Sequence, residues 1–75
     1  MQVLIVESSR ELGQLWKRHI ERQGLDVSLV QGQDAAITHL REHDVQVIIL
    51  DVVLTEGSAF AVADYASYKR PGARG

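Results

Sequence analysis

The fold is indicated most clearly by residues 45–51, VQVIILD. This run of β-branched and apolar side chains is nearly unbroken and ends on a carboxylate, Asp51. Such a run is typical of a strand buried on both faces, as in parallel sheets that helices cover on either side. Asp51 would then lie at the carboxyl end of that strand. Open α/β sheets bind ligands at this edge, so the position of Asp51 suggests a functional role.

The segments before and after this strand alternate between strand and helix patterns. Apolar runs bounded by turn residues predict strands, and apolar side chains at three- and four-residue spacing predict helices. We expect strands at about residues 2–6, 25–30 and 45–51, and helices at about residues 9–23, 34–43 and 58–68. The order β-α-β-α-β-α implies right-handed crossovers, and therefore a parallel sheet with helices on both faces.

The ends of the predicted helices carry sequence signals. Ser8 and Glu11 stand three residues apart, as in a capping box, and predict a helix that begins near Ser9. Gly24 is expected to end this helix because glycine readily adopts a positive φ. Asp34 is expected to cap the second helix.

The first predicted helix carries an apolar stripe. Its members recur at helical spacing and are Leu12, Leu15, Trp16, His19 and Ile20. Such a stripe normally faces the core of a globular domain. We therefore expect Trp16 to pack in the interior rather than to recognise a ligand.

Length and composition limit the class of protein. A chain of 75 residues is one small domain, and such a domain buries only about 60% of the surface of its unfolded form. Hydrophobic residues make up 45% and charged residues 24%, a globular balance. The net charge of −2 argues against nucleic-acid and membrane-surface partners, which need a concentrated positive field. With no cysteine and no apolar run of membrane-spanning length, a soluble cytoplasmic protein is expected.

Two segments together resemble a known family. Residues 4–8, LIVES, precede a predicted helix, and residues 47–58 read VIILDVVLTEGS. These motifs resemble the receiver domain of bacterial two-component response regulators, whose flavodoxin-like fold has five βα units in strand order 2-1-3-4-5. The resemblance covers essentially residues 1–75 but only the N-terminal three βα units of the family. It implies a partial receiver-like domain of the α/β class, a truncated flavodoxin-like fold with a parallel three-stranded sheet in order 2-1-3.

The resemblance also implies a chemistry. In the family, the residue equivalent to Asp51 accepts a phosphoryl group from a histidine kinase or a phosphotransfer protein. A carboxylate can do this when the charge on the phosphoryl oxygens is neutralised. Mg²⁺ has that task in the family, and the positions that match its ligands are Glu7, Asp51 and the backbone carbonyl of Val53. We do not expect such a chain to be an enzyme by itself.

Three positions depart from the family pattern. Ser8 offers a neutral hydroxyl where the family usually has a second acid, which weakens the expected Mg²⁺ site, and Ser8 is also a candidate helix cap. Thr55 stands where proline is common, and Ala59 where glycine is usual. The phosphoryl-binding residues after the family's fourth and fifth strands lie beyond the three matched units. A degenerate, non-phosphorylated module for protein interaction or dimerisation is therefore an open alternative.

The resemblance has a consequence for self-association. The family's third strand lies between the first and the fourth, so in a three-stranded sheet its outer edge from Val45 to Leu50 would be open. An exposed apolar edge invites pairing with another chain. We therefore expect self-association through Val45–Leu50.

A second motif is compatible with metal binding. The residues His39-Leu40-Arg41-Glu42-His43 fit the H-x-x-E-H pattern of a family of zinc peptidases. However, the predicted helix is short, His43 falls at its end, and no third ligand follows. A solvated polar helix face is the expected role.

Overall fold

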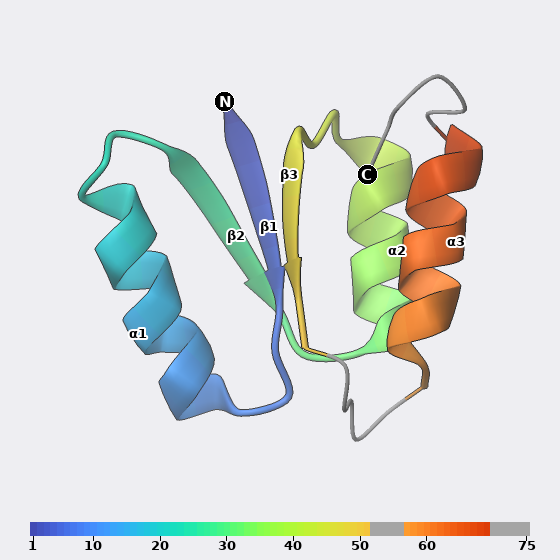
Figure 1. The fold of residues 1–75 in the computed structure, drawn as a ribbon, viewed down its shortest axis with the longest axis horizontal. Helices are drawn as coiled ribbons and strands as arrows, with labels where there is room; N and C mark the ends of the chain where they lie inside the picture. The colour runs from blue at the N-terminus through green and yellow to red at the C-terminus, as the bar shows by residue number, and fades with distance from the viewer. Residues whose placement is uncertain (52–56, 70–75) are drawn as a thin grey trace.

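The structure is a computed structural model that describes residues 1–51 and 57–69. Strands and helices alternate along the chain (Figure 1). The strands are β1 (Gln2–Val6), β2 (Asp26–Val30) and β3 (Val47–Leu50). The helices are α1 (Arg10–Glu21), α2 (Gln33–Glu42) and α3 (Ala59–Lys69). This is the predicted β-α-β-α-β-α order.

The three strands form one parallel sheet in the order β2-β1-β3. The central strand, β1, pairs along its length with β2, from Gln2 opposite Asp26 to Val6 opposite Val30. On its other side, Val6 lies opposite Leu50 of β3. Helix α1 covers one face of the sheet, and α2 and α3 cover the other (Figure 1). The expected fold class, with its strand order 2-1-3, is confirmed.

The core lies between the sheet and the pair of helices α2 and α3. Its buried members come from β1, α2, α3 and the segment before β3, and are Leu4, Val6, Ala36, Leu40, Val45 and Val62. The remaining buried side chains of β1, Val3 and Ile5, face the opposite side because side chains alternate along a strand. The central strand is thus buried on both faces, which explains its continuous apolar sequence.

The predicted limits of β3 are too long, since the regular strand is Val47–Leu50 rather than 45–51. Backbone contacts nevertheless continue beyond it at both ends. The N–H of Gln46 donates to the carbonyl of Gln2, and the N–H of Asp51 donates to that of Val6. Asp51 therefore remains attached to the central strand.

Two of the predicted helix caps are wrong by one or two residues. The N-cap of α1 is Ser9 rather than Ser8, and its hydroxyl accepts from the N–H of Leu12. Helix α2 begins after Gly32, which leaves Asp34 within the first turn, where an acidic side chain still interacts favourably with the helix dipole. Gly24 has the predicted positive φ, 84°, but lies two residues beyond the C-cap of α1, Arg22.

The predicted inward stripe of α1 is also wrong. Leu12, Leu15 and Trp16 are 43%, 60% and 46% exposed, and the buried residue of this helix is Gly13. A Cβ at position 13 would lie 2.6 Å from a side-chain carbon of Leu29. The helix therefore approaches β2 closely through its glycine, and this orientation turns most of the apolar stripe away from the sheet.

Among the described residues, no helix is both long enough and apolar enough to cross a bilayer.

Two leucines on different helices provide a test of this packing. We expect Leu40→Ala to lower the free energy of unfolding by about 2–5 kcal/mol, because it leaves a cavity in the core. The side chain of Leu40 is 4% exposed and that of Leu15 is 60% exposed. Leu15→Ala should therefore cost less than about 1 kcal/mol. Urea unfolding followed by circular dichroism measures both values, and equal losses would contradict the assigned orientation of α1.

Candidate functional site

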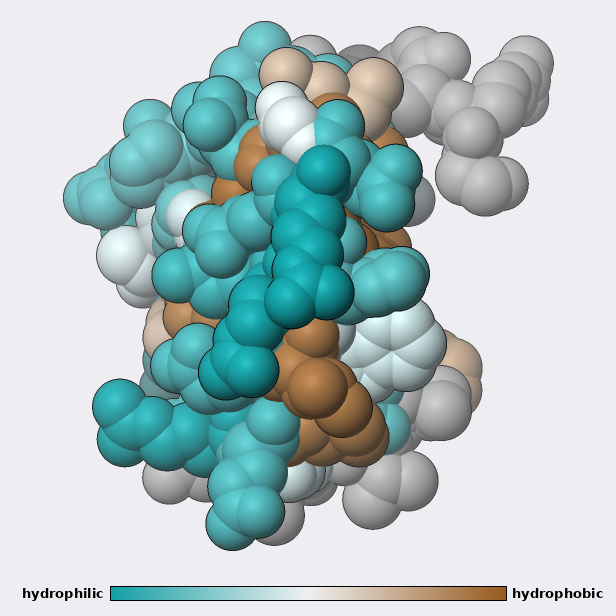
Figure 2. Space-filling view, turned by 90° about the vertical axis from the view of Figure 1, so that its left-hand side faces the viewer, coloured by the Kyte–Doolittle hydropathy of each residue, from teal (hydrophilic) through white to brown (hydrophobic). Residues whose placement is uncertain are grey.

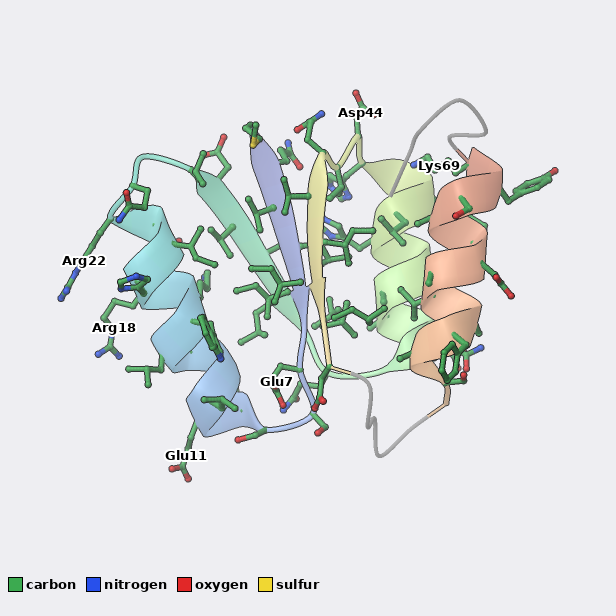
Figure 3. All side chains as sticks on the ribbon, viewed as in Figure 1. Glu7, Glu11, Arg18, Arg22, Asp44 and Lys69 are labelled. Carbon is green, nitrogen blue, oxygen red and sulfur yellow. The ribbon has the colours of Figure 1, made fainter. Side chains whose placement is uncertain are left out.

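The candidate site lies at the carboxyl edge of the sheet, where Glu7 follows β1 and Asp51 follows β3. The two positions are neighbours because the preceding residues, Val6 and Leu50, are paired. In Figure 3, Glu7 lies at this end of the sheet and Asp44 at the opposite end. The structure thus brings together the two acidic residues that the sequence selected.

Backbone hydrogen bonds fix the positions of both acids. The N–H of Asp51 donates to the carbonyl of Val6 at 2.9 Å, and the N–H of Glu7 donates to the carbonyl of Val30 at 3.0 Å. Both side chains are partly buried. Each acid is therefore anchored by its main chain, and its carboxylate belongs to a loop at the sheet edge rather than to a flexible terminus.

Ser8 contributes to the site in a way that the sequence did not reveal. Its hydroxyl lies 3.4 Å from Oδ2 of Asp51, a long hydrogen bond in which Ser8 donates. The carboxylate of Glu7 accepts from the N–H of Ser9 at 3.2 Å. Because Ser9 serves as the helix cap, Ser8 is free of that role and faces the candidate phosphoacceptor.

A side-chain hydrogen bond joins the start of α2 to the start of α3. The side-chain oxygen of Gln33, the first residue of α2, accepts from the N–H of Ser58 at 2.8 Å. Ser58 in turn caps α3, since its hydroxyl accepts from the N–H groups of Phe60 and Ala61. The adjacent Gly57 has a φ of 80°, and a Cβ there would collide with Gln33. The neutral amide of Gln33 thus holds the start of α3 against the start of α2.

The metal-binding expectation rests on few ligands. Within residues 1–51 and 57–69, no group of three or more histidine, cysteine or acidic side chains could hold a metal ion. The expected carbonyl ligand, that of Val53, lies outside the described residues, as does Thr55. Glu7, Asp51 and the hydroxyl of Ser8 remain, and this fits Mg²⁺, which commonly uses only one or two protein carboxylates and completes its shell with water and phosphate oxygens.

The two histidines of the H-x-x-E-H motif lie at the other end of α2. Their rings are stacked, with centroids 4.2 Å apart and an interplanar angle of 16°. Nδ1 of His43 lies 3.1 Å from the carbonyl oxygen of His39. They form a local pair at the C-terminal end of the helix, away from Glu7 and Asp51.

The sheet order, the covering helices and the two carboxylates at one edge define a receiver-like α/β domain. The fold of this chain is similar to that of a signal receiver domain from Vibrio parahaemolyticus, in a protein assigned as a Luxo repressor. The two chains share 30% sequence identity, and the TM-score between this structure and that crystal structure is 0.84. The similarity covers 92% of this chain and 53% of that one, so this chain spans about half of its length. No protein-family model and no curated protein matches the sequence. The chain therefore has a truncated receiver-like, flavodoxin-like fold, represented by three βα units in strand order 2-1-3.

The histidine pair leads to a prediction about pH. Partial burial lowers the pKa of His39 from 6.5, with further lowering by His43 and Lys69 and an opposing effect of Glu42. Below about pH 6.5, the unfolded chain then binds this proton more readily than the folded chain, so stability falls as the pH falls.

We expect His39→Gln to reduce this loss of stability, because the substituted side chain does not titrate. Urea unfolding at a series of pH values from 8 to about 5 measures the effect. An unchanged slope in the variant would contradict the assignment to His39.

Proposed function

We propose that Asp51 accepts a phosphoryl group and that the chain belongs to a two-component signalling pathway. The observation that supports this most strongly is the placement of Asp51 at the carboxyl edge of the sheet, attached through its N–H to β1 and in contact with Ser8. Because Glu7 directly follows β1, a second carboxylate is available close by. Similarity to a signal receiver domain adds support.

The proposed step is a phosphoryl transfer. A carboxylate oxygen of Asp51 attacks phosphorus, an acyl phosphate O–P bond forms, and the bond from phosphorus to the donor breaks, with its electron pair remaining on the donor. The donor is a phosphohistidine in a histidine kinase or in a phosphotransfer protein. Catalysis of such a transfer depends mainly on position and on neutralisation of charge. Main-chain anchoring of Asp51 supplies the first of these requirements.

In this proposal, a cation neutralises the negative charge that develops on the phosphoryl group. Glu7 and Asp51 would hold Mg²⁺, with Val53 contributing its carbonyl, and the bound ion would offset the negative charge of the phosphoryl oxygens. The hydroxyl of Ser8 lies beside Asp51 and can donate a hydrogen bond to an oxygen of the acyl phosphate. The absence of a second acid at position 8 predicts weak binding of the ion.

The proposal includes a cellular setting. The partner is a histidine kinase or phosphotransfer protein, and the location is the cytoplasm. The chain acts as an acceptor and carrier of the phosphoryl group and not as an enzyme in its own right.

The first test is chemical labelling with acetyl phosphate and Mg²⁺. We expect label on the wild-type chain that hydroxylamine removes, because acyl phosphates are cleaved by that nucleophile, and no label on Asp51→Asn. Asp26→Asn is the matched control, since Asp26 begins β2 at the opposite end of the sheet. Label that persists in Asp51→Asn would refute the assignment.

A second test concerns the weak cation site. We expect Ser8→Asp to tighten Mg²⁺ binding by roughly tenfold, because it adds an anionic oxygen ligand beside Asp51. Titration calorimetry with Mg²⁺ measures the change, and Ser67→Asp on the exposed surface of α3 controls for net charge. Equal affinities in the two variants would mean that position 8 does not face the ion.

The alternative is a receiver-like interaction module without phosphorylation, including the expected self-association through Val45–Leu50. The neutral Ser8 at the position of a second acid favours it. In the described residues, Val47 of the outer strand β3 is 39% exposed. This alternative predicts no label on the wild-type chain and no response to Mg²⁺, so the two tests above separate the candidates.

A further inference from the structure

The most prominent unexplained surface of the molecule lies on α1. Figure 2 looks onto this side and shows hydrophobic residues alongside the hydrophilic ridge of the helix. A hollow of about 430 Å³ is present there, and its lining consists of Leu12, Leu15, Trp16, Arg18, His19 and Arg22. Exposed apolar surface of this kind marks sites of protein interaction. The groove does not belong to the phosphoacceptor site, which lies at the sheet edge.

The order of the side chains along this surface is informative. Glu11, Leu15, Arg18 and Arg22 follow one another at intervals of four, three and four residues, and such intervals place side chains on one stripe of a helix. The stripe is therefore acidic at its N-terminal end, apolar in its middle and basic at its C-terminal end. In Figure 3, its three charged side chains point away from the sheet.

These charges have no ion-pair partners within the described part of the chain. The ion pair of this helix, between Lys17 and Glu21, lies off the stripe. All four residues of the stripe are exposed. Glu11, Arg18 and Arg22 are thus available to a partner that presents the opposite charges.

We propose that the occupant of this surface is a second copy of the chain, with the two α1 helices packed antiparallel across a two-fold axis. A two-fold contact uses the same patch on both copies, so the patch must be complementary to its own reversed image. The stripe meets this condition, because reversal brings the acidic end of one helix beside the basic end of the other.

The positions of the charges also fix the register. The midpoint between Glu11 and Arg18 falls at residues 14–15, so the axis passes near Leu15. The two Leu15 side chains then meet at the centre of the contact, and Leu12 of each copy lies near Trp16 of the other. Each Glu11 faces the partner's Arg18, which gives two ion pairs at the rim. Apolar residues at the centre and charged residues at the edge are the usual arrangement of a specific interface.

Opposed helix dipoles favour the same orientation, since each helix carries partial positive charge at its N-terminus and partial negative charge at its C-terminus. A single pair of helices buries little area, so we expect a weak, concentration-dependent dimer. Its site differs from the β3 edge that the sequence suggested, because α1 contacts mainly β2 and β1.

The decisive experiment exchanges the charges. In Glu11→Arg and in Arg18→Glu, like charges would meet twice across the axis, so each variant alone should dimerise roughly tenfold more weakly than the wild type. An equimolar mixture of the two variants should recover association, because opposite charges again meet at both contacts. Sedimentation equilibrium across a range of concentrations measures all three samples.

Two controls separate a lost interface from lost folding. Circular dichroism of each variant should retain the wild-type helical signal, and Arg41→Glu, an exposed reversal on α2, should leave dimerisation unchanged. Leu15→Glu should abolish dimerisation without loss of helix, because Leu15 is exposed in the single chain.

Cross-linking tests the geometry directly. The chain contains no cysteine, so a single introduced thiol is an unambiguous probe. Leu15→Cys should form an intermolecular disulfide on mild oxidation, whereas Gln14→Cys, on the other flank of α1, should react far more slowly. A monomeric wild type at all concentrations would overturn the proposal. So would a dimer that resists Leu15→Glu and is cross-linked through Val47→Cys, since that dimer would use the β3 edge.

Discussion

The whole arrangement depends on the double pairing of β1. This strand is hydrogen-bonded to β2 on one side and to β3 on the other, and its side chains from Val3 to Val6 are all buried. Glu7 directly follows its carboxyl end, and the carbonyl of Val6, its last residue, accepts a hydrogen bond from the N–H of Asp51. One five-residue strand therefore supplies buried side chains to the hydrophobic core and connects by its carboxyl end to the main chain of both acidic residues.

The sequence was sufficient to predict the order of elements and the edge at which the site lies. Continuous apolar runs in β1 and β3 are a strong signal, because a strand buried on both faces leaves no room for polar side chains. Asp51 could be selected because it directly follows such a run, whereas Glu7 was selected through the resemblance to the receiver family. The role of Val53 remains a prediction, since that residue lies outside the described part of the chain.

Other details could not be read from local patterns because they depend on tertiary contacts. The choice of Ser9 over Ser8 as the cap follows from where the chain leaves β1, and only then does Ser8 turn toward Asp51. The contact between Gln33 and Ser58 joins residues 25 positions apart, and no spacing rule connects them. For α1, helical periodicity identified an apolar stripe correctly but not its direction. The close approach of Gly13 to Leu29 decided which side of the helix faces the sheet.

Helix α2 has two ends of different chemical character. At its C-terminal end, His39 titrates with a lowered pKa, and Lys69 donates to the carbonyl of His43. At its N-terminal end, the link to α3 uses the amide of Gln33, which carries no ionisable group. A change in proton concentration can therefore loosen the far end of this helix while the end beside Asp51 keeps its hydrogen bond. Acidification therefore acts on the C-terminal end of α2 through His39, and not through the hydrogen bond that links its N-terminal end to α3.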